Sequence, residues 1–499
     1  MLRVRLRLHL VNAQHVPTNV MEITQLPDDC LQGIFSHLPL KQKVYIERVC
    51  RSWRNILLRH ASHSNTEFVD FSELVPSSAN QDQFEYILGE AIERVGTYVQ
   101  RLTFGGKWHR ITQSVIDSLS QKCKRLQSLD ISASIIEADI GNLMKIMRNH
   151  LQHISTEDSS WAQEEQAQQM DSQFSILINL QSLNVRGITS ALKSLDRLPP
   201  TLKSADLSSI QNLSPESFLN FLKAQKGLTD LRLNPLSVLN KDIINAIGAL
   251  SRLENLEIGC PSIVSRPSQL PLDSITQLGG LKSLSISYCN IIDSLCLLQL
   301  SYKLRKLRTL KLKKCQMIDD FSPLHNFSKL ECLKIAESKN LRDSDLIRIA
   351  DKKKLKHLTV INCSGITSLS IKAIIRQCPL IELNLEKCEN IGDEIFSTLA
   401  ASTHTIESIS LKGCSSITSN GISIIALMPN INQIHELNLS DNRNIDDQAL
   451  IRIHTSLWLK MDERLTPAPK SAVMKIDATR TGVSENVEKD IGDLIDLIC

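Results

Sequence analysis

The feature that most constrains this chain is a short leucine pattern, LxxLxL, that recurs along most of its length. Clear copies are LKSLSISYCNI from Leu281, LRTLKLKKCQMIDD from Leu307 and LIELNLEKCENIGD from Leu380. Fourteen copies begin at Val99, Leu126, Leu151, Leu180, Leu202, Leu228, Leu253, Leu281, Leu307, Leu330, Leu355, Leu380, Ile406 and Ile434. Thirteen intervals therefore span 335 residues, which gives a mean period of about 25.8 residues. A period of this length indicates a solenoid of stacked units.

Each copy predicts a strand followed by a helix. The fourth and sixth positions alternate with polar residues, so they share one face of a short strand. A small polar residue then stands where the chain leaves the strand and can bond the backbone of the turn, as at Cys289, Cys315, Cys363, Cys388 and Cys414. Segments such as GDEIFSTLAAS (Gly392 to Ser402) follow with helical apolar spacing. One unit buries only part of its apolar surface, so its neighbours must complete the core.

The repeats resemble the cysteine-containing class of leucine-rich repeats, with CPLIELNLEKCENIGD from Cys378 as the closest match. The resemblance implies an α/β solenoid, curved into a horseshoe with short parallel strands inside and helices outside. The exposed strand positions would line its concave face, where such proteins bind their partners. The predicted substrate-binding residues on that face are Lys311, Lys313, Lys334, His357, Glu382, Asn384, Glu386, Lys412 and Glu436.

Composition limits the classes of function. The 57 Lys and Arg against 54 Asp and Glu leave a net charge of +3, which does not favour a nucleic-acid partner. The thirteen scattered cysteines and the absence of a signal peptide predict reduced thiols in the cytoplasm or the nucleus. No apolar run is long enough to predict a membrane span. Metal-ligand spacing and catalytic motifs are also absent, so we expect no metal, no cofactor and no enzyme activity.

A second kind of module precedes the repeats, LPDDCLQGIFSHLPLKQKVYIERVCRSW from Leu26 to Trp53. Pro27 suits the first turn of a helix, and the aspartates after it favour the positive end of the helix. One apolar stripe recurs at helical spacing over Leu31, Ile34, Phe35 and Leu38, and LPL then ends that helix. A second stripe consists of Val49, Trp53, Ile56 and Leu57. A module of so few residues can bury only a small hydrophobic core, so we expect a binding partner to add to its stability.

This module resembles the F-box, whose helices dock on the Skp adaptor of cullin-RING ubiquitin ligases. The family's Leu-Pro opening, Ile-Phe pair, Leu-Pro break and closing Val-Cys-x-x-Trp all have counterparts here. By this resemblance the adaptor-binding residues are Leu26, Pro27, Leu31, Ile34, Phe35, Leu38, Pro39, Val49 and Trp53. The chain departs from the family at Cys30, Gln42 and Lys43, and these departures predict weaker adaptor binding.

An F-box followed by leucine-rich repeats resembles the substrate receptors of SCF (Skp–cullin–F-box) ligases, which tether a protein for ubiquitination and proteasomal degradation. Tethering raises the effective concentration of a substrate lysine near the conjugating enzyme. Two alternatives stay open. One is a scaffold whose F-box acts without a cullin. The other is a small-molecule receptor, which we rank low because no interval exceeds 29 residues and no long loop covers the solenoid.

The resulting domain prediction has five parts. Residues 1–20 form a flexible extension, because MEITQLPDD from Met21 would be an ordinary start for an F-box protein. The F-box occupies 21–62, an atypical capping repeat 63–98, and about fourteen leucine-rich repeats 99–460. Residues 461–499 are polar, contain two prolines and are predicted to be a flexible tail.

Overall fold

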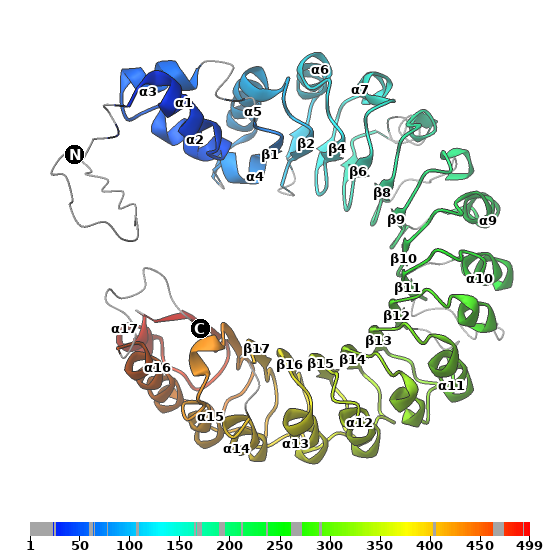
Figure 1. Ribbon diagram of the computed structural model, residues 1–499, viewed down its shortest axis with the longest axis vertical. Coiled ribbons are helices and arrows are strands. Elements are labelled where there is room, and N and C mark those ends of the chain that lie inside the picture. Colours follow the sequence, from blue (N-terminus) through cyan, green and yellow to red (C-terminus); the bar gives the residue numbers. More distant parts are fainter. Residues whose placement is uncertain are drawn as a thin grey trace, which may run out of the picture.

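The computed structural model has the shape of a horseshoe, in which one long curved sheet lines the inside and helices cover the outside (Figure 1). A small helical module stands at the N-terminal end (Figure 1). The structure describes residues 23, 26–58, 63, 65–76, 78–105, 109–163, 166, 172–188, 195–210, 213–235, 238–260, 272–288, 292–402, 406–462, 474–492 and 494–499. The predicted extension 1–20 and Cys289 therefore lie outside the described residues.

In the described part of the chain, the inner sheet contains seventeen strands, and every pairing in it is parallel. Each strand pairs with the next one of this sheet along the chain. The strands are β1 (Phe68–Asp70), β2 (Arg101–Thr103), β4 (Ser128–Asp130), β6 (His153–Ser155), β8 (Ser182–Asn184), β9 (Ser204–Asp206), β10 (Asp230–Leu233), β11 (Asn255–Gly259), β12 (Ser283–Ser287), β13 (Thr309–Lys313), β14 (Cys332–Ala336), β15 (His357–Ile361), β16 (Glu382–Asn384), β17 (Ser408–Ser410), β18 (Glu436–Asn438), β19 (Met474–Asp477) and β20 (Ile495–Ile498). A second small sheet joins β3 (Arg110–Ile111), β5 (Ile135–Ile136) and β7 (Ser160–Trp161).

The α/β solenoid predicted from the sequence is confirmed, and the repeat pattern locates its strands. Each of the fourteen predicted starts lies two residues before the first residue of a strand, from β2 after Val99 to β18 after Ile434. In β13, Leu310 and Leu312 are buried in the core, whereas Lys311 between them is exposed on the other face. The sequence predicts these strands well because alternation along a strand is a local property.

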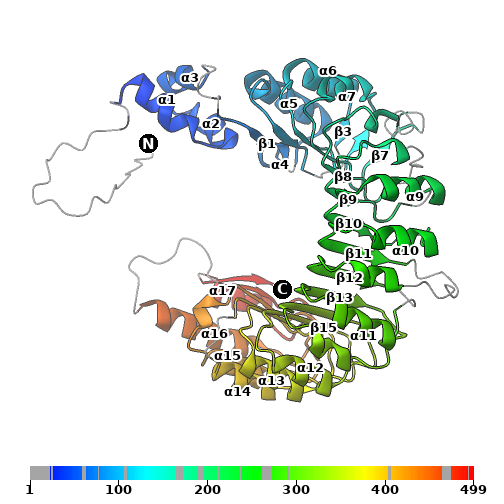
Figure 2. The ribbon, with the colours of Figure 1, turned by 45° about the vertical axis from the view of Figure 1, so that its right-hand side comes forward.

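Helices return the chain along the outer side of the curve (Figure 2). They are α4 (Phe71–Leu74), α5 (Gln81–Val95), α6 (Gln113–Lys122), α7 (Gly141–Met147), α9 (Pro215–Ala224), α10 (Lys241–Gly248), α11 (Ser294–Lys303), α12 (Asp343–Ala350), α13 (Ser368–Gln377), α14 (Glu394–Ala400), α15 (Ser419–Ile425), α16 (Asp447–Asp462) and α17 (Glu488–Ile491).

Short 3₁₀ segments replace the helix in some repeats and accompany it in others. They are η3 (Leu195–Arg197), η4 (Leu272–Gln277), η5 (Ser322–Asn326), η6 (Ile431–Gln433) and η7 (Glu485–Val487). Two of them, η3 and η5, lie in the shortest repeats, those starting at Leu180 and Leu307, which leave the fewest residues for a helical return.

The turn after each strand is the most regular feature of the solenoid. In most repeats the chain turns at a residue with positive φ, such as Lys314 and Asn362, and the next residue is a buried Cys or its equivalent. The Cys388 thiol donates a hydrogen bond to the carbonyl of Val360 in the preceding repeat, at 3.4 Å. Asn442 performs the same role with its amide, which donates to the carbonyl of Leu411 at 2.8 Å. The predicted turn-bonding role is therefore confirmed at these positions.

These cysteines are buried in the core, and burial changes the acidity of their thiols. Burial raises the pKa of the Cys363 thiol to about 11 and that of Cys414 to about 12. A thiol with such a pKa is almost never a thiolate near neutral pH, and the thiolate is the nucleophile and the metal ligand. Among the described residues, no cluster of His, Cys, Asp and Glu has the arrangement of a metal site.

The prediction of a flexible tail for 461–499 is wrong for most of its described residues. Strand β19 pairs with β18, and β20 pairs with β19, so the sheet continues to the end of the chain. Met474 and Ile476 are buried and alternate with Lys475 and Asp477. The LxxLxL pattern missed this strand because its apolar positions are not leucine, and the flanking polar residues obscured the alternation.

Replacing Asn442 with Ala tests the turn. The substitution removes the side-chain donor to the buried carbonyls of Leu411 and Leu439, of which Leu411 keeps the backbone amide of Cys414, so we expect it to lower the free energy of unfolding by about 1–3 kcal/mol. Urea denaturation followed by circular dichroism measures the change. Asn442→Cys is the matched control and should cost less, because other repeats use Cys here. Equal stability of the Ala and wild-type chains would contradict the role of this side chain.

Candidate functional site

The N-terminal module is a bundle of three short helices, α1 (Asp28–Ser36), α2 (Leu40–Ile46) and α3 (Arg51–Leu57). Prolines precede the first two helices, and two aspartates occupy the first turn of α1. The Cys50 sulfur caps α3 by accepting a hydrogen bond from the backbone amide of Trp53. A helix with Asp in its first turn gains from the helix dipole, and Pro before or at the first turn removes no needed donor.

The module has a hydrophobic core of its own, separate from that of the solenoid. Leu31, Phe35, Ile56 and Leu57 are buried in it. The Phe35 and Trp53 rings meet edge to face with their centroids 5.1 Å apart. Four buried side chains hold a small module, so each of them contributes much of its stability.

The predicted adaptor-binding residues divide into three groups by their exposure. Leu31 and Phe35 are each only 2% exposed, so their assignment to the adaptor surface needs correction: they support the module from within. Leu26, Leu38 and Trp53 are partly buried and pack against the same core. Four of the nine are exposed, namely Pro27, Ile34, Pro39 and Val49.

Among the described residues, exposed large apolar side chains gather on this module. Ile34 is 44% exposed and Val49 is 60% exposed, and Tyr45 and Leu58 are exposed as well. Sequence reasoning missed Tyr45 and Leu58, because periodicity identifies an apolar stripe but not the side of a helix that is left uncovered. Four large exposed apolar side chains on so small a module favour a protein-binding role for it.

Helix α2 joins the module to the solenoid through three residues on one side of the helix. Leu40 belongs to the hydrophobic core of the solenoid rather than to that of the module. The buried Lys43 ammonium donates a hydrogen bond to the Thr66 hydroxyl at 3.1 Å, and burial lowers the pKa of Lys43. Glu47 pairs with Arg94 of α5 at 2.7 Å. We call this contact region the seam.

The seam explains why Lys43 differs from the residue that the F-box family usually has at this position. Lys43 was expected to weaken adaptor binding because the F-box usually has an aliphatic residue there. The structure instead buries Lys43 against the start of the solenoid. Its aliphatic stem can pack while its charged end reaches a polar partner.

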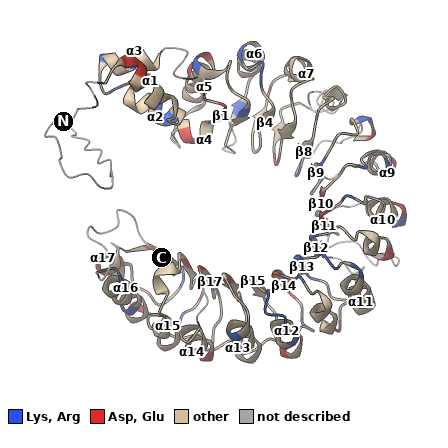
Figure 3. Cartoon of the chain, in the orientation of Figure 1, with Lys and Arg blue, Asp and Glu red and all other residues tan. Residues whose placement is uncertain are grey.

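The nine predicted substrate-binding residues all lie on, or just after, strands β13 to β18, on the inner side of the curve (Figure 1). Both signs of charge occur along the inner strands (Figure 3). Parallel pairing places Lys311 opposite Lys334, and His357 opposite Glu382. The structure thus brings these residues onto one surface but spreads them over six strands.

Several charged residues on this face contact an oppositely charged or polar neighbour in the next repeat. Glu157 pairs with Arg186 at 3.1 Å, and Asp206 with Arg232 at 3.6 Å. Further along, His357 contacts Glu382 at 3.2 Å, Lys412 contacts Asp441 at 3.8 Å, and Arg480 contacts Asp441 at 2.7 Å. Such exposed pairs contribute little to stability, but each ion pair reduces the net charge of its part of the surface.

A basic patch, made of Lys311, Lys313 and Lys334, interrupts this pattern. None of the three has an ion pair with a carboxylate of the described residues. Lys313 lies over the ring of Tyr288 instead, at 5.2 Å from the centroid. Like charges opposite one another on adjacent strands destabilise a sheet. Lys311 and Lys334 have this arrangement, so the basic patch is the part of the concave face best suited to an anionic partner.

Comparison with known proteins decides the nature of the N-terminal module. Residues 23–65 match the family model described as F-box domain. The module is an F-box. An F-box joined to a leucine-rich-repeat solenoid has a substrate-recognition or interaction role, and F-box domains bind Skp-like adaptors. Proteins of this architecture are typically non-catalytic adaptors. Among the described helices, none is both long enough and apolar enough to cross a membrane.

Solved structures with similar folds are distant from this chain. The yeast Rad7–Elc1 complex is matched at 16% identity with a TM-score of 0.46, over 90% of this chain and 96% of the other. A leucine-rich-repeat protein of Leptospira interrogans is matched at 16% identity with a TM-score of 0.41, over 82% and 98%. TLR13 in complex with single-stranded RNA is matched at 13% identity with a TM-score of 0.46, over 81% of this chain but only 52% of its own. Because these values are low, nothing about partners or substrates follows from them.

The separate cores predict separate responses to mutation. Phe35→Ala removes the largest side chain of the F-box core and should destabilise that module by about 3–5 kcal/mol. Hydrogen exchange measured by mass spectrometry should show lost protection over residues 26–58, while strands β12 to β15 stay protected. Phe396→Ala, in the solenoid core, is the control and should reverse this pattern. Equal loss in both regions would contradict two separate cores.

Proposed function

We propose that this chain is the substrate-recognition subunit of an SCF E3 ubiquitin ligase. Its F-box binds the Skp adaptor, and through it the cullin, while the concave face of the solenoid holds the protein to be ubiquitinated. The observation that best supports this proposal is the seam. It fixes a module with exposed apolar side chains to one end of a curved surface. A cytoplasmic or nuclear location is part of this proposal.

The adaptor surface in this proposal centres on the exposed residues Ile34 and Val49, and Tyr45 and Leu58 of the F-box are exposed as well. Pro27 and Pro39 are exposed as well. Leu26, Leu38 and Trp53 present partly buried surface, and Leu31 and Phe35 keep the helices in place. Burying apolar surface of this kind in a complex is the main source of affinity in protein association.

The seam gives the proposal its mechanism. Leu40, the Lys43–Thr66 hydrogen bond and the Glu47–Arg94 ion pair restrain rotation of the F-box relative to the solenoid. A bound substrate is therefore held in a restricted orientation relative to the adaptor. Such positioning raises the effective concentration of a substrate lysine at the conjugating enzyme without any bond chemistry by this chain.

The substrate in this proposal carries a negatively charged segment, because the basic patch is the least neutralised part of the concave face. His357, Glu382, Asn384, Glu386, Lys412 and Glu436 extend the contact surface on neighbouring repeats. Complementary charges of this kind favour specificity and the rate of association more than affinity alone.

Substituting the exposed apolar residues tests adaptor binding. Ile34→Asp and Val49→Asp should each weaken binding of the purified Skp adaptor at least tenfold, as measured by biolayer interferometry, because each places a charge in a desolvated interface. Both side chains are exposed, so thermal stability should change little. Leu295→Asp, on the exposed side of α11, is the matched control and should bind normally. Co-purification of the adaptor without any cullin would favour the cullin-independent scaffold.

Reversing charge in the basic patch tests substrate binding. The double variant Lys311→Glu/Lys334→Glu should lose proteins that co-purify with the wild-type chain and are ubiquitinated by the reconstituted ligase, while adaptor binding stays normal. Lys223→Glu/Lys303→Glu, on helices α9 and α11, changes charge equally and should keep them. If the basic-patch variant retains every such substrate, the basic patch is not part of the substrate-binding surface.

A further inference from the structure

An open pocket lies beside the seam, between the F-box and helix α5. Its volume is about 540 Å³, and its lining comes from α2 and the residues after it, from α3 and from α5. The residues that line it are Val44, Glu47, Arg48, Cys50, Arg51, Arg54 and Arg94. Its volume falls within the range of small-molecule sites, but most small-molecule sites are more apolar than this one.

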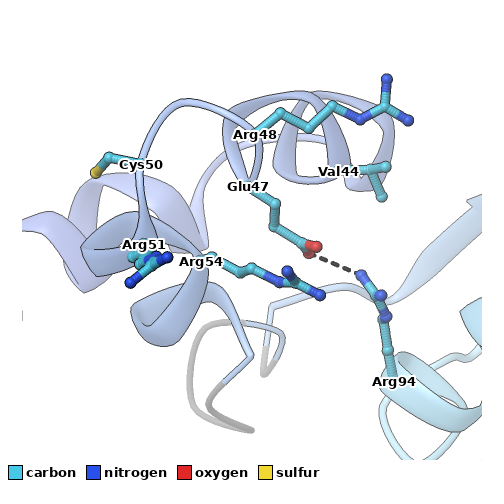
Figure 4. Close-up of a pocket in the computed structure, with 7 residues that line it drawn as sticks. All are labelled: Val44, Glu47, Arg48, Cys50, Arg51, Arg54 and Arg94. Carbon is cyan, nitrogen blue, oxygen red and sulfur yellow. Dashed lines mark hydrogen bonds and ion pairs between the residues drawn. The ribbon is translucent and has the colours of Figure 1, made fainter.

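The charge of this seam pocket is unbalanced. Four arginines line it against a single carboxylate, that of Glu47. Arg54 and Arg94 extend toward Glu47, and Arg94 forms the ion pair across the seam (Figure 4). Arg48, Arg51 and Arg54 have no ion pair with a carboxylate of the described residues. Arg94 is paired with Glu47 and also with Glu90 at 3.7 Å, so the net positive charge of the pocket comes from the three F-box arginines.

Gathering several arginines around one pocket has a cost that a ligand can offset. Like charges repel, and an anion placed between them removes that repulsion. Guanidinium groups bind phosphate with two parallel hydrogen bonds, and Arg is favoured wherever phosphate is recognised in this planar way. A ligand that engages several arginines at once must carry several anionic oxygens on a small frame.

We propose that the seam pocket binds a small oligophosphate anion. Arg54 of the F-box and Arg94 of the solenoid hold it across the seam, while Arg48 and Arg51 line the same pocket and add positive charge. The bound anion neutralises the arginines and links the two parts of the chain across the seam. It thereby stiffens the orientation of the F-box. This site is distinct from the basic patch, and its existence does not depend on the ligase function.

The test uses the full chain and sodium tripolyphosphate, with binding measured by titration calorimetry at moderate salt. We expect saturable binding of one tripolyphosphate per chain, and at least tenfold weaker binding of orthophosphate. Arg51→Gln/Arg54→Gln should weaken tripolyphosphate binding at least tenfold. Arg252→Gln, an exposed arginine of the solenoid, is the matched control and should leave it unchanged. Unchanged melting temperatures of both variants exclude loss of the fold.

A cysteine reports binding at the pocket itself. Cys50 lines the pocket and is exposed, and Cys30 on α1 is exposed as well but does not line it. Tripolyphosphate should slow alkylation of Cys50 by iodoacetamide, read by mass spectrometry, and should leave Cys30 unaffected. The proposal is overturned if binding is absent, if the arginine variant binds as well as wild type, or if both cysteines are protected alike. Loss of adaptor binding in the arginine variant, without tripolyphosphate binding to the wild type, would instead assign these arginines to the adaptor interface.

Discussion

The structure depends on the sharing of apolar surface between neighbouring repeats. No single strand and helix of this chain encloses a core, so each repeat buries its leucines against the next, and one continuous core runs from Leu40 in the F-box to Ile495 near the end of the chain. In-register parallel pairing fixes which residues share each column of the inner face. Every charge relationship on that face follows from this register, including the opposition of Lys311 and Lys334 and the pairing of His357 with Glu382.

The F-box has a small core of its own but also uses that shared core. Leu31 and Phe35 keep its helices together, while Leu40 on α2 packs with the solenoid. This division lets the two modules differ in stability and still keep a fixed relative orientation, because Lys43 and Glu47 add polar contacts on the same side of α2. A receptor that positions one protein relative to another needs such a restraint, since a freely rotating link would dilute the effective concentration it creates.

An element of this fold can be predicted from the sequence when the residues that define it lie close together in the chain. The fourteen strand starts and the turn cysteines could be read from sequence, because alternation and the turn residue lie within ten positions of one another. The last two strands could not, because MKID and IDLI lack the leucine pattern. The small sheet of β3, β5 and β7 could not be predicted either, because strands of two residues are too short to show an alternating pattern. At the candidate site the sequence indicated which residues are apolar, but not that Phe35 is buried while Ile34 beside it is exposed.

The repeat period, the strand positions, the alternation of buried and exposed residues and the F-box can all be read from the amino-acid sequence, because each depends on residues close together in the chain. How the F-box sits on the solenoid, which concave charges are paired, and that Arg94 meets Glu47 in a pocket also lined by Arg51 and Arg54 emerge only from the folded chain. These relationships join residues from different helices or different repeats. Only the packing of α2 against the solenoid, and the register of one strand on the next, brings such residues together.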